Sequence, residues 1–224
     1  MKWIYWILSW LFPSKCILCG KLLKQDETDL CNNCRIHAPE CPVSKIKYPH
    51  IDQWTALWYY EGDVRHSILR YKFHNRRSYA SAYARLLAMR LHRENRLDFD
   101  VLTWIPISRR RLRKRGFDQV QLLAQKLGQE LGIEPLCTLQ KVRNNKQQSR
   151  IHGKAQRQAN VLGAYQAINP SSIAGKRILL LDDILTTGAT AGECATVLRV
   201  AGASEVQFAA LAAANKNRTD RGSL

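Results

Sequence analysis

The chain has 224 residues, of which 46% are hydrophobic, so it can bury the core of one domain and carry a small appendage. This content excludes a chain without a packed core. The formal net charge of +17 and a pI of about 9.9 favour polyanionic partners, either nucleic acid or a phosphorylated substrate, over a merely basic surface.

The first segment, residues 1–13, contains the strongly apolar run MKWIYWILSWLF. This run is too short to span a bilayer, and no small-residue cleavage site follows it. We therefore expect a short apolar helix that packs on protein, with contact to a membrane surface as the minor alternative. With no transmembrane segment and no export signal evident, the sequence predicts a cytoplasmic protein.

Residues 14–48 are predicted to form a zinc-binding module of the double zinc ribbon kind. Two C-x2-C pairs have the spacing of a four-thiolate structural zinc site, and their members are Cys16, Cys19, Cys31 and Cys34. Disulfides would need an oxidising compartment and are the minor alternative. We interpret Cys41 as a small buried residue rather than a fifth ligand, and we expect Cys137 and Cys194 to be core residues.

A larger domain is predicted over residues 49–214, followed by a disordered tail over residues 215–224. Apolar and aromatic runs predict strands, and apolar residues at helical spacing predict helices between them. The expected strands are residues 54–60, 101–107, 178–181 and 206–213, and the expected helices include residues 79–91 and 120–131. Their alternation indicates an α/β fold with a parallel twisted sheet flanked by helices.

Two polar segments interrupt this alternation. Residues 108–118 are expected to be a loop that places six basic residues beyond the carboxyl end of a strand, where they would hold a phosphorylated ligand, face nucleic acid or be solvated. Residues 141–160 show almost no apolar periodicity, so we expect a long loop or hairpin. Loops of that length in a compact domain are usually functional or disordered.

The run ILLLDDILTTGAT, residues 178–190, couples a buried strand with two carboxylates and a small-residue loop that opens a helix. The backbone N–H groups of a helix N-terminus hold phosphate, and Gly188 allows close approach of the backbone. Asp182 and Asp183 suit a ligand that also presents hydroxyls, as ribose 5-phosphate does. A Walker B strand is disfavoured, because the chain contains no G-x-x-x-x-G-K-[ST] loop.

This run resembles the phosphoribosyl pyrophosphate (PRPP) motif of type I phosphoribosyltransferases at every position. The order of cysteine pairs, I-P-I-S, R-x-R-x-R-G-F-D-Q, R-x-x-N and PRPP motif resembles the ComF/GntX family of competence proteins from about Cys16 to Ala213. Asp118 stands where the family usually has Asn. A further C-x2-C-G of many relatives is missing near Cys41.

The resemblance implies a type I phosphoribosyltransferase fold with a small N-terminal zinc-binding module, and it implies roles for individual residues. The implied PRPP-binding residues are Asp182, Asp183, Ile184, Thr186, Thr187, Gly188, Ala189 and Thr190. Ser108, Arg109 and Arg115 would bind the pyrophosphate, and a flap would carry Gln148, Arg157 and Asn160. Zinc would be structural, and Mg²⁺ would bridge pyrophosphate and ribose oxygens.

The function implied by the family is DNA uptake and natural transformation, with single-stranded DNA and a competence helicase or membrane-channel protein as partners. The predicted activity is transfer of a phosphoribosyl (pentosyl) group. No catalytic residue is identified, although His74, His152 and Glu193 are available. The alternative is a non-catalytic protein that senses PRPP or binds single-stranded DNA, with the aromatic run 54–60 as a stacking platform, although aromatic strands are more often core.

Overall fold

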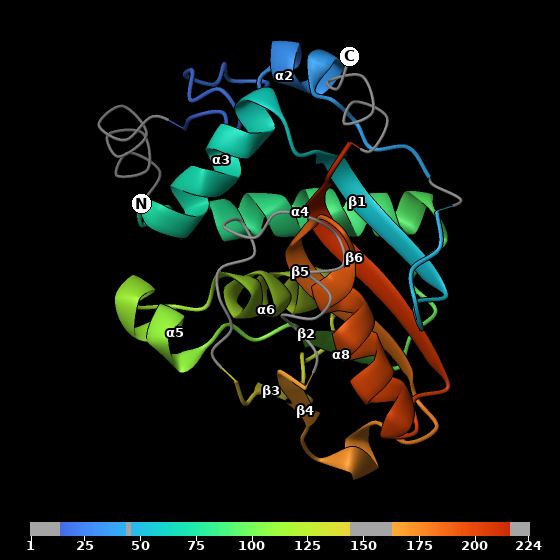
Figure 1. Ribbon diagram of the computed structural model, residues 1–224. Coiled ribbons are helices and arrows are strands. Elements are labelled where there is room, and N and C mark those ends of the chain that lie inside the picture. The colour runs from blue at the N-terminus through green and yellow to red at the C-terminus, as the bar shows by residue number, and fades with distance from the viewer. Residues whose placement is uncertain (1–13, 44–45, 144–162, 216–224) are drawn as a thin grey trace, which may run out of the picture.

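The computed structural model describes residues 14–43, 46–143 and 163–215, and the larger part of these forms a parallel sheet between layers of helices (Figure 1). The strand order is β1-β6-β5-β2, and every neighbouring pair is parallel. The strands are β1 (Gln53–Tyr59), β2 (Val101–Trp104), β5 (Arg177–Leu185) and β6 (Glu205–Ala213). The parallel sheet expected from the sequence is confirmed.

The two faces of the sheet have separate cores because successive side chains of a strand point to opposite faces. On β5, Leu179 and Leu181 join the core under the first helical layer, whereas Ile178 and Leu180 join the core on the other side. The first layer consists of α3 (Gly62–Phe73), α4 (Tyr79–Arg93) and α6 (Gln119–Leu131). The second contains α8 (Ala189–Val200) and the antiparallel pair β3 (Leu139–Lys141) and β4 (Tyr165–Ala167).

Helix α6 shows how local sequence sets an element of this fold. Its apolar residues recur at helical spacing and are almost fully buried: Val120, Leu123, Ala124 and Leu127. The carboxylate of Asp118 caps its first turn by accepting from the backbone N–H groups of Val120 and Gln121. Gly132 ends the helix in the left-handed region with φ 70°. The helix predicted over residues 120–131 is confirmed.

The cysteine-bearing segment packs on the first helical layer rather than standing apart. Ile17, Leu18 and Leu30 belong to the same hydrophobic core as α3, α4 and α6. The segment has an isolated antiparallel bridge between Lys15 and Leu22, the short helix α2 (Asn32–His37), and loops elsewhere. Its burial against the helices means that its conformation and theirs depend on each other.

Two expectations about individual segments are corrected. Residues 108–118 contain the helix α5 (Arg109–Arg115) rather than an open loop, because Ser108 caps its start and Gly116, with φ 76°, ends it. Cys137 is exposed, because the segment between α6 and β3 runs along the surface. The expectation that the aromatic strand is core is confirmed for Trp54 and Trp58, which are buried and offer no stacking platform.

The expected apolar helix of residues 1–13 and the tail beyond residue 215 lie outside the described residues, as does most of the polar segment 141–160. The flap residues Gln148, Arg157 and Asn160 and the candidate His152 fall in that part of the chain. Across the described ranges, no helix has both the length and the apolar character that crossing a bilayer requires.

Candidate functional site

The two acids of the predicted ligand site lie on β5, which continues to Leu185. They follow the alternation of the strand and turn to opposite layers. Asp183 lies on the side of α3 and α6, where it contacts Lys72 and Gln119. Asp182 lies on the side of α8 and the β3–β4 pair, where its charge acts on Cys194 and Tyr165. Adjacent positions in the sequence therefore reach different surroundings.

Asp183 is a buried carboxylate with both oxygens engaged. The Lys72 ammonium lies 2.8 Å from its Oδ1, and the Gln119 amide donates to its Oδ2 at 2.8 Å. Burial raises the pKa of Asp183, but the Lys72 and Gln119 contacts and the nearby Arg115 outweigh it and leave the pKa lowered. The sequence did not identify Lys72 as a site residue, because nothing in its own helix signals the contact. Gln119 directly follows Asp118 in the R-G-F-D-Q box, a signal that could have identified it.

Asp182 is partly exposed, and its pKa shifts in the direction opposite to that of Asp183. Its Oδ1 accepts a hydrogen bond of 2.8 Å from the backbone N–H of Asp183. Burial and the neighbouring Asp183 charge raise the pKa of Asp182 to about 8. The acid pair therefore combines one carboxylate stabilised by a cation with one that resists ionisation.

The predicted phosphate loop leads from β5 into α8. Thr186 and Thr187 are half-buried, and Gly188, with φ 80°, is the N-cap residue of α8. A Cβ on Gly188 would lie 2.0 Å from Cδ1 of Tyr48, so that no side chain fits between this loop and the Tyr48 ring. The loop is thus held against residues that precede β1, with the backbone N–H groups of the first turn of α8 at its end.

The predicted pyrophosphate residues lie on and around α5. Ser108 is buried and accepts from the backbone N–H of Arg111, whereas Arg109 is exposed. Arg115 is half-buried, and it donates to Gln119 Oε1 at 2.8 Å. Burial lowers the pKa of Arg115, and the charge of Asp183 opposes this shift. Arg115 thereby joins the network around Asp183, whereas Arg109 is exposed at the start of α5.

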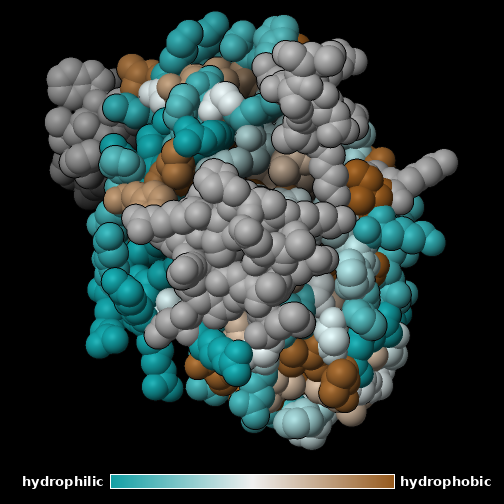
Figure 2. Space-filling view, in the orientation of Figure 1, coloured by the Kyte–Doolittle hydropathy of each residue, from teal (hydrophilic) through white to brown (hydrophobic). Residues whose placement is uncertain are grey.

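Two reciprocal stacking contacts join α5 to the end of α3. The Arg115 guanidinium lies 4.7 Å from the Phe73 ring centroid, and the Arg77 guanidinium lies 4.8 Å from that of Phe117. Phe73 is 56% exposed. Hydrophilic side chains cover the left edge of this view of the molecule, where α5 lies (Figure 2). The result is one basic surface, which we call the α5 surface; its exposed members are Phe73, His74, Arg76, Arg77, Arg109, Arg110, Arg113 and Lys114.

Asp118, which stands in place of the family's usual Asn, connects two elements. Its Oδ1 accepts a hydrogen bond from the backbone N–H of Val120 in α6, and its Oδ2 accepts one of 3.0 Å from the backbone N–H of Ile107. A carboxylate can accept on both oxygens, whereas an amide would turn an NH₂ group towards one of these donors. The substitution therefore suits the connection between the end of β2 and the start of α6.

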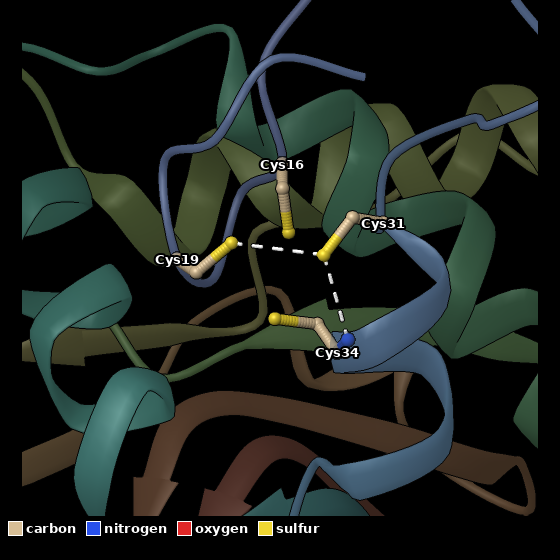
Figure 3. Close-up of side chains that lie close together, drawn as sticks. All are labelled: Cys16, Cys19, Cys31 and Cys34. Carbon is tan, nitrogen blue, oxygen red and sulfur yellow. Dashed lines mark hydrogen bonds between the residues drawn. The ribbon is translucent and has the colours of Figure 1, made fainter. Parts of the chain in front are cut away.

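The four predicted zinc ligands converge on one point (Figure 3). The Sγ atoms of Cys16, Cys19, Cys31 and Cys34 all lie within 4.8 Å of one another. Burial and the neighbouring cysteines raise the pKa of the Cys34 thiol, because four sulfur atoms so close together cannot all ionise without a cation between them. Four thiolates match the donor set of a structural zinc ion. Cys41 is buried outside this cluster, as expected.

Side chains of helix α3 hydrogen-bond the backbone between the two cysteines of the first pair. Ser67 Oγ donates to the carbonyl of Ile17, and the Arg70 guanidinium donates to the carbonyls of Ile17 and Leu18. These carbonyls lie between Cys16 and Cys19. The last turn of the same helix carries Lys72. One helix therefore contacts both the cysteine cluster and the acid pair.

The fold does not place the candidate residues His74 and Glu193 in contact with the acid pair. His74 is exposed on the α5 surface. Glu193 accepts from the backbone N–H of Gly163 at 2.7 Å, where the described chain resumes after the polar segment. We assign neither residue to the activation of a nucleophile.

Comparison with known proteins agrees with this architecture. A family model described as the phosphoribosyl transferase domain matches residues 112–222. With the parallel sheet and its helical layers, this match confirms the type I phosphoribosyltransferase fold. Among solved structures, glutamine phosphoribosylpyrophosphate amidotransferase from B. subtilis aligns with 63% of this chain and 30% of its own, at 25% identity and a TM-score of 0.43.

Full-length relatives are also found. The chain is 30% identical over 224 residues to Competence protein ComFC of Streptococcus pneumoniae, an alignment that covers 86% of this chain and 97% of that protein. It is 28% identical over 226 residues to Competence protein F of Haemophilus influenzae, with coverage of 91% and 98%. The similarity therefore extends well beyond residues 112–222, the part that the family model matches.

Proposed function

Because the chain belongs to the ComF family of competence proteins, we propose that its phosphoribosyltransferase domain binds PRPP with Mg²⁺ in the service of DNA uptake. The observation that supports this proposal most directly is the path of the chain from β5 to α8. It brings a carboxylate pair, a threonine-bearing loop and a helix N-terminus together within nine residues, 182–190.

Each part of PRPP has a counterpart along this path. The first turn of α8 and the loop of Thr186, Thr187 and Thr190 would hold the 5-phosphate through N–H and hydroxyl donors. An acid of the pair would accept from the ribose hydroxyls. Arg115, half-buried beside Asp183, and Arg109 would neutralise the pyrophosphate, because a guanidinium matches phosphate oxygens in a bidentate manner.

Two metal ions have different places in the proposal. The four cysteines could hold a structural metal such as zinc, and they provide a complete thiolate set for it. For Mg²⁺, the ligand itself carries most of the oxygen donors, and the Asp182 carboxylate suits a hard cation. Bound there, Mg²⁺ would neutralise charge on the leaving pyrophosphate.

If transfer follows binding, the reaction is a displacement at C1 of the ribose by a phosphoribosyl acceptor, with pyrophosphate as leaving group. The residues of the site would contribute by orienting the ligand and by neutralising the leaving group rather than by activating a nucleophile. A protein that binds PRPP as a signal would use the same residues without transfer.

Calorimetric titration with PRPP and Mg²⁺ tests the binding proposal. Replacing both Asp182 and Asp183 by Asn should lower the affinity at least ~10-fold, equal to ~1.4 kcal/mol, while Asp63→Asn on the exposed part of α3 should leave it unchanged. Equal affinities of the wild-type and double-variant proteins would contradict the site. Pyrophosphate release with candidate bases or amines then separates a transferase from a sensor, since binding without release under any acceptor excludes transfer.

A second candidate function, binding of single-stranded DNA, is supported by the α5 surface. This surface combines exposed cations with Phe73, an aromatic ring exposed among them. Stacking on an aromatic ring and a charged track along the phosphates are the usual elements of single-strand binding. Here two segments far apart in sequence supply these elements together.

Fluorescence anisotropy with a labelled thymidine oligonucleotide tests this second function across a range of salt concentrations. Replacing Arg110 and Arg113 by Ala should weaken binding and lower the slope of log K against log salt by ~1.4, since each lost phosphate contact accounts for ~0.7. The matched variant, with Arg65 and Lys176 replaced by Ala, removes two exposed cations elsewhere and should keep the slope. A wild-type affinity that does not change with salt would rule out the α5 surface.

A further inference from the structure

Lys72 is the least expected member of the acid site. It lies in the last turn of α3, before the matched phosphoribosyl transferase segment of residues 112–222 begins. Its ammonium is nevertheless 2.8 Å from Asp183 Oδ1, and the side chains of the two residues are 14% and 9% exposed. An ion pair this far from water sacrifices hydration of both charges, so it is weak evidence for stability and calls for another explanation.

The surroundings of Asp183 show that its position is specified from several sides. Lys72 from α3 and Gln119 from α6 each bind one carboxylate oxygen, and Gln119 is in turn bound by Arg115 from α5. The rings of Tyr71 and Tyr83 lie in the same core, and the Asp183 charge raises the pKa of both tyrosines after burial has raised it. The carboxylate of Asp183 is therefore held inward, against the first helical layer.

The position of Asp183 also determines that of Asp182. The backbone N–H of Asp183 donates to Asp182 Oδ1, so fixing Asp183 fixes the donor that orients the neighbouring carboxylate. Among the described residues, that bond is the one hydrogen bond of the Asp182 side chain, and it leaves Oδ2 for a ligand. A chain of contacts thus runs from the Lys72 ammonium through Asp183 to the partly exposed Asp182.

We propose that Lys72 is a positioning residue for sugar recognition, which holds Asp183 against the helices and thereby assigns the ribose hydroxyls to Asp182. The inference rests on the proposed function, since it concerns how the proposed PRPP site recognises the ribose hydroxyls. Asp182, rather than the pair, distinguishes a ribose from a 2-deoxyribose. Lys72 acts through Asp183 and does not touch the sugar.

The test compares affinities for ribose 5-phosphate and 2-deoxyribose 5-phosphate, two ligands that differ in one hydroxyl. The wild-type protein should prefer ribose 5-phosphate by about 10-fold, within the usual scale of one hydrogen bond. Asp182→Asn should bring the ratio of the two affinities close to one. Asp183→Asn, which retains an oxygen acceptor for Lys72, should keep most of the preference.

Variants of Lys72 separate positioning from general support of the fold. Lys72→Met should lower the preference for ribose 5-phosphate at least about three-fold, whereas Lys72→Arg should keep it. In the Asp182→Asn protein, adding Lys72→Met should not change the ratio of the two affinities any further. Lys126→Met, at a lysine on α6 that bonds Gln129, is the matched control. A purely structural Lys72 would weaken both ligands equally.

The possible outcomes separate this inference from the proposed function. If the wild-type protein binds neither PRPP nor ribose 5-phosphate, the proposed function is wrong, and the inference with it. Alternatively, the wild-type protein binds PRPP and prefers ribose 5-phosphate clearly over 2-deoxyribose 5-phosphate. In that case the inference alone is overturned if Lys72→Met leaves the ratio of the two affinities unchanged or if Asp183→Asn abolishes the preference. If Lys72→Met fails to fold, the ratios of Asp182→Asn and Asp183→Asn still decide, because a preference kept in Asp182→Asn or lost in Asp183→Asn overturns the inference.

Discussion

The cysteine cluster and the acid site are built in opposite ways. The four sulfur atoms come from two short pairs within residues 16–34, so all four ligands belong to one local segment. The acid site draws Asp183 from β5, Lys72 from α3, Gln119 from α6 and, through Gln119, Arg115 from α5. A local site can be recognised from spacing in a sequence, whereas an assembled site is recognised only in part, through whichever member carries a motif.

The largest expected effect concerns the local site. Cys34→Ser should remove the metal that its sulfur would bind and lower the free energy of unfolding by more than about 4 kcal/mol, a loss typical of a missing metal. The melting temperature of a chain this size should then fall by about 10 °C, because Ile17, Leu18 and Leu30 share the core of α3, α4 and α6. Thermal unfolding measures the melting temperature, and metal analysis measures the metal content, which should be about one zinc per chain in the wild-type protein.

Cys137→Ser is the control for this experiment, because Cys137 is exposed and outside the cluster. Its melting temperature should stay at the wild-type value. If Cys34→Ser and Cys137→Ser melt together, or if the wild-type protein is fully folded without metal, the cluster has no structural role.

A smaller effect is expected where the assembled site depends on local backbone geometry. Gly188→Ala would place a Cβ 2.0 Å from Tyr48 Cδ1 at a φ of 80°, so strain and a clash add together. We expect a loss of about 3 kcal/mol in stability, in the upper range for overpacking, together with loss of PRPP binding. Chemical denaturation and calorimetry measure the two losses.

Gly175→Ala provides a matched control, since Gly175 also has positive φ, at 72°, but has nothing within 4 Å of its Cβ position. Its cost should be about 1 kcal/mol, the left-handed strain alone. Equal costs at the two glycines would mean that the Tyr48 contact does not shape the loop.

The acid pair predicts a pH dependence of stability. Burial and the Asp183 charge raise the pKa of Asp182 to about 8, so between about pH 4 and pH 8 the folded state holds a proton that the unfolded state has released. Stability should therefore decrease as pH rises through this window, by at most about 1.4 kcal/mol per pH unit. Asp182→Asn should remove that slope, as measured by melting temperature against pH.

The low pKa of Asp183 acts in the opposite sense and at lower pH. Its charged form is favoured in the folded state by Lys72 and Gln119, so its contribution is present above the unfolded pKa and is lost as pH falls through the folded value. If stability between pH 5 and pH 8 were equally flat in the wild-type protein and in Asp182→Asn, the two acids would not differ in the way described.

The smallest expected effect is at Asp118. Asp118→Asn should cost about 1 kcal/mol, since the amide cannot accept both from Ile107 and from the first turn of α6. Equilibrium denaturation checks this value. An Asn that proves as stable as Asp would show that one accepting oxygen is enough for this connection, and that the departure from the family residue has no structural reason.

Local patterns predicted much of the fold correctly. The strands around Trp54, Val101, Ile178 and Val206 were each signalled by a short apolar run, and α6 by helical spacing between Asp118 and Gly132. One error came from capping signals inside a segment that were outweighed by its composition. Six basic residues suggested a loop at 108–118, yet a capping serine and a terminal glycine bound about two turns of helix there.

The sequence by itself determined the four-cysteine cluster, the strand and loop of the PRPP motif, and the class of fold, because each depends on residues close together in the chain. Only the tertiary structure decided that Asp182 and Asp183 face different layers and that Lys72 and Gln119 reach one of them. The physical reason is the two-residue period of a strand, which sends adjacent side chains to opposite faces, where helices from distant segments supply their partners.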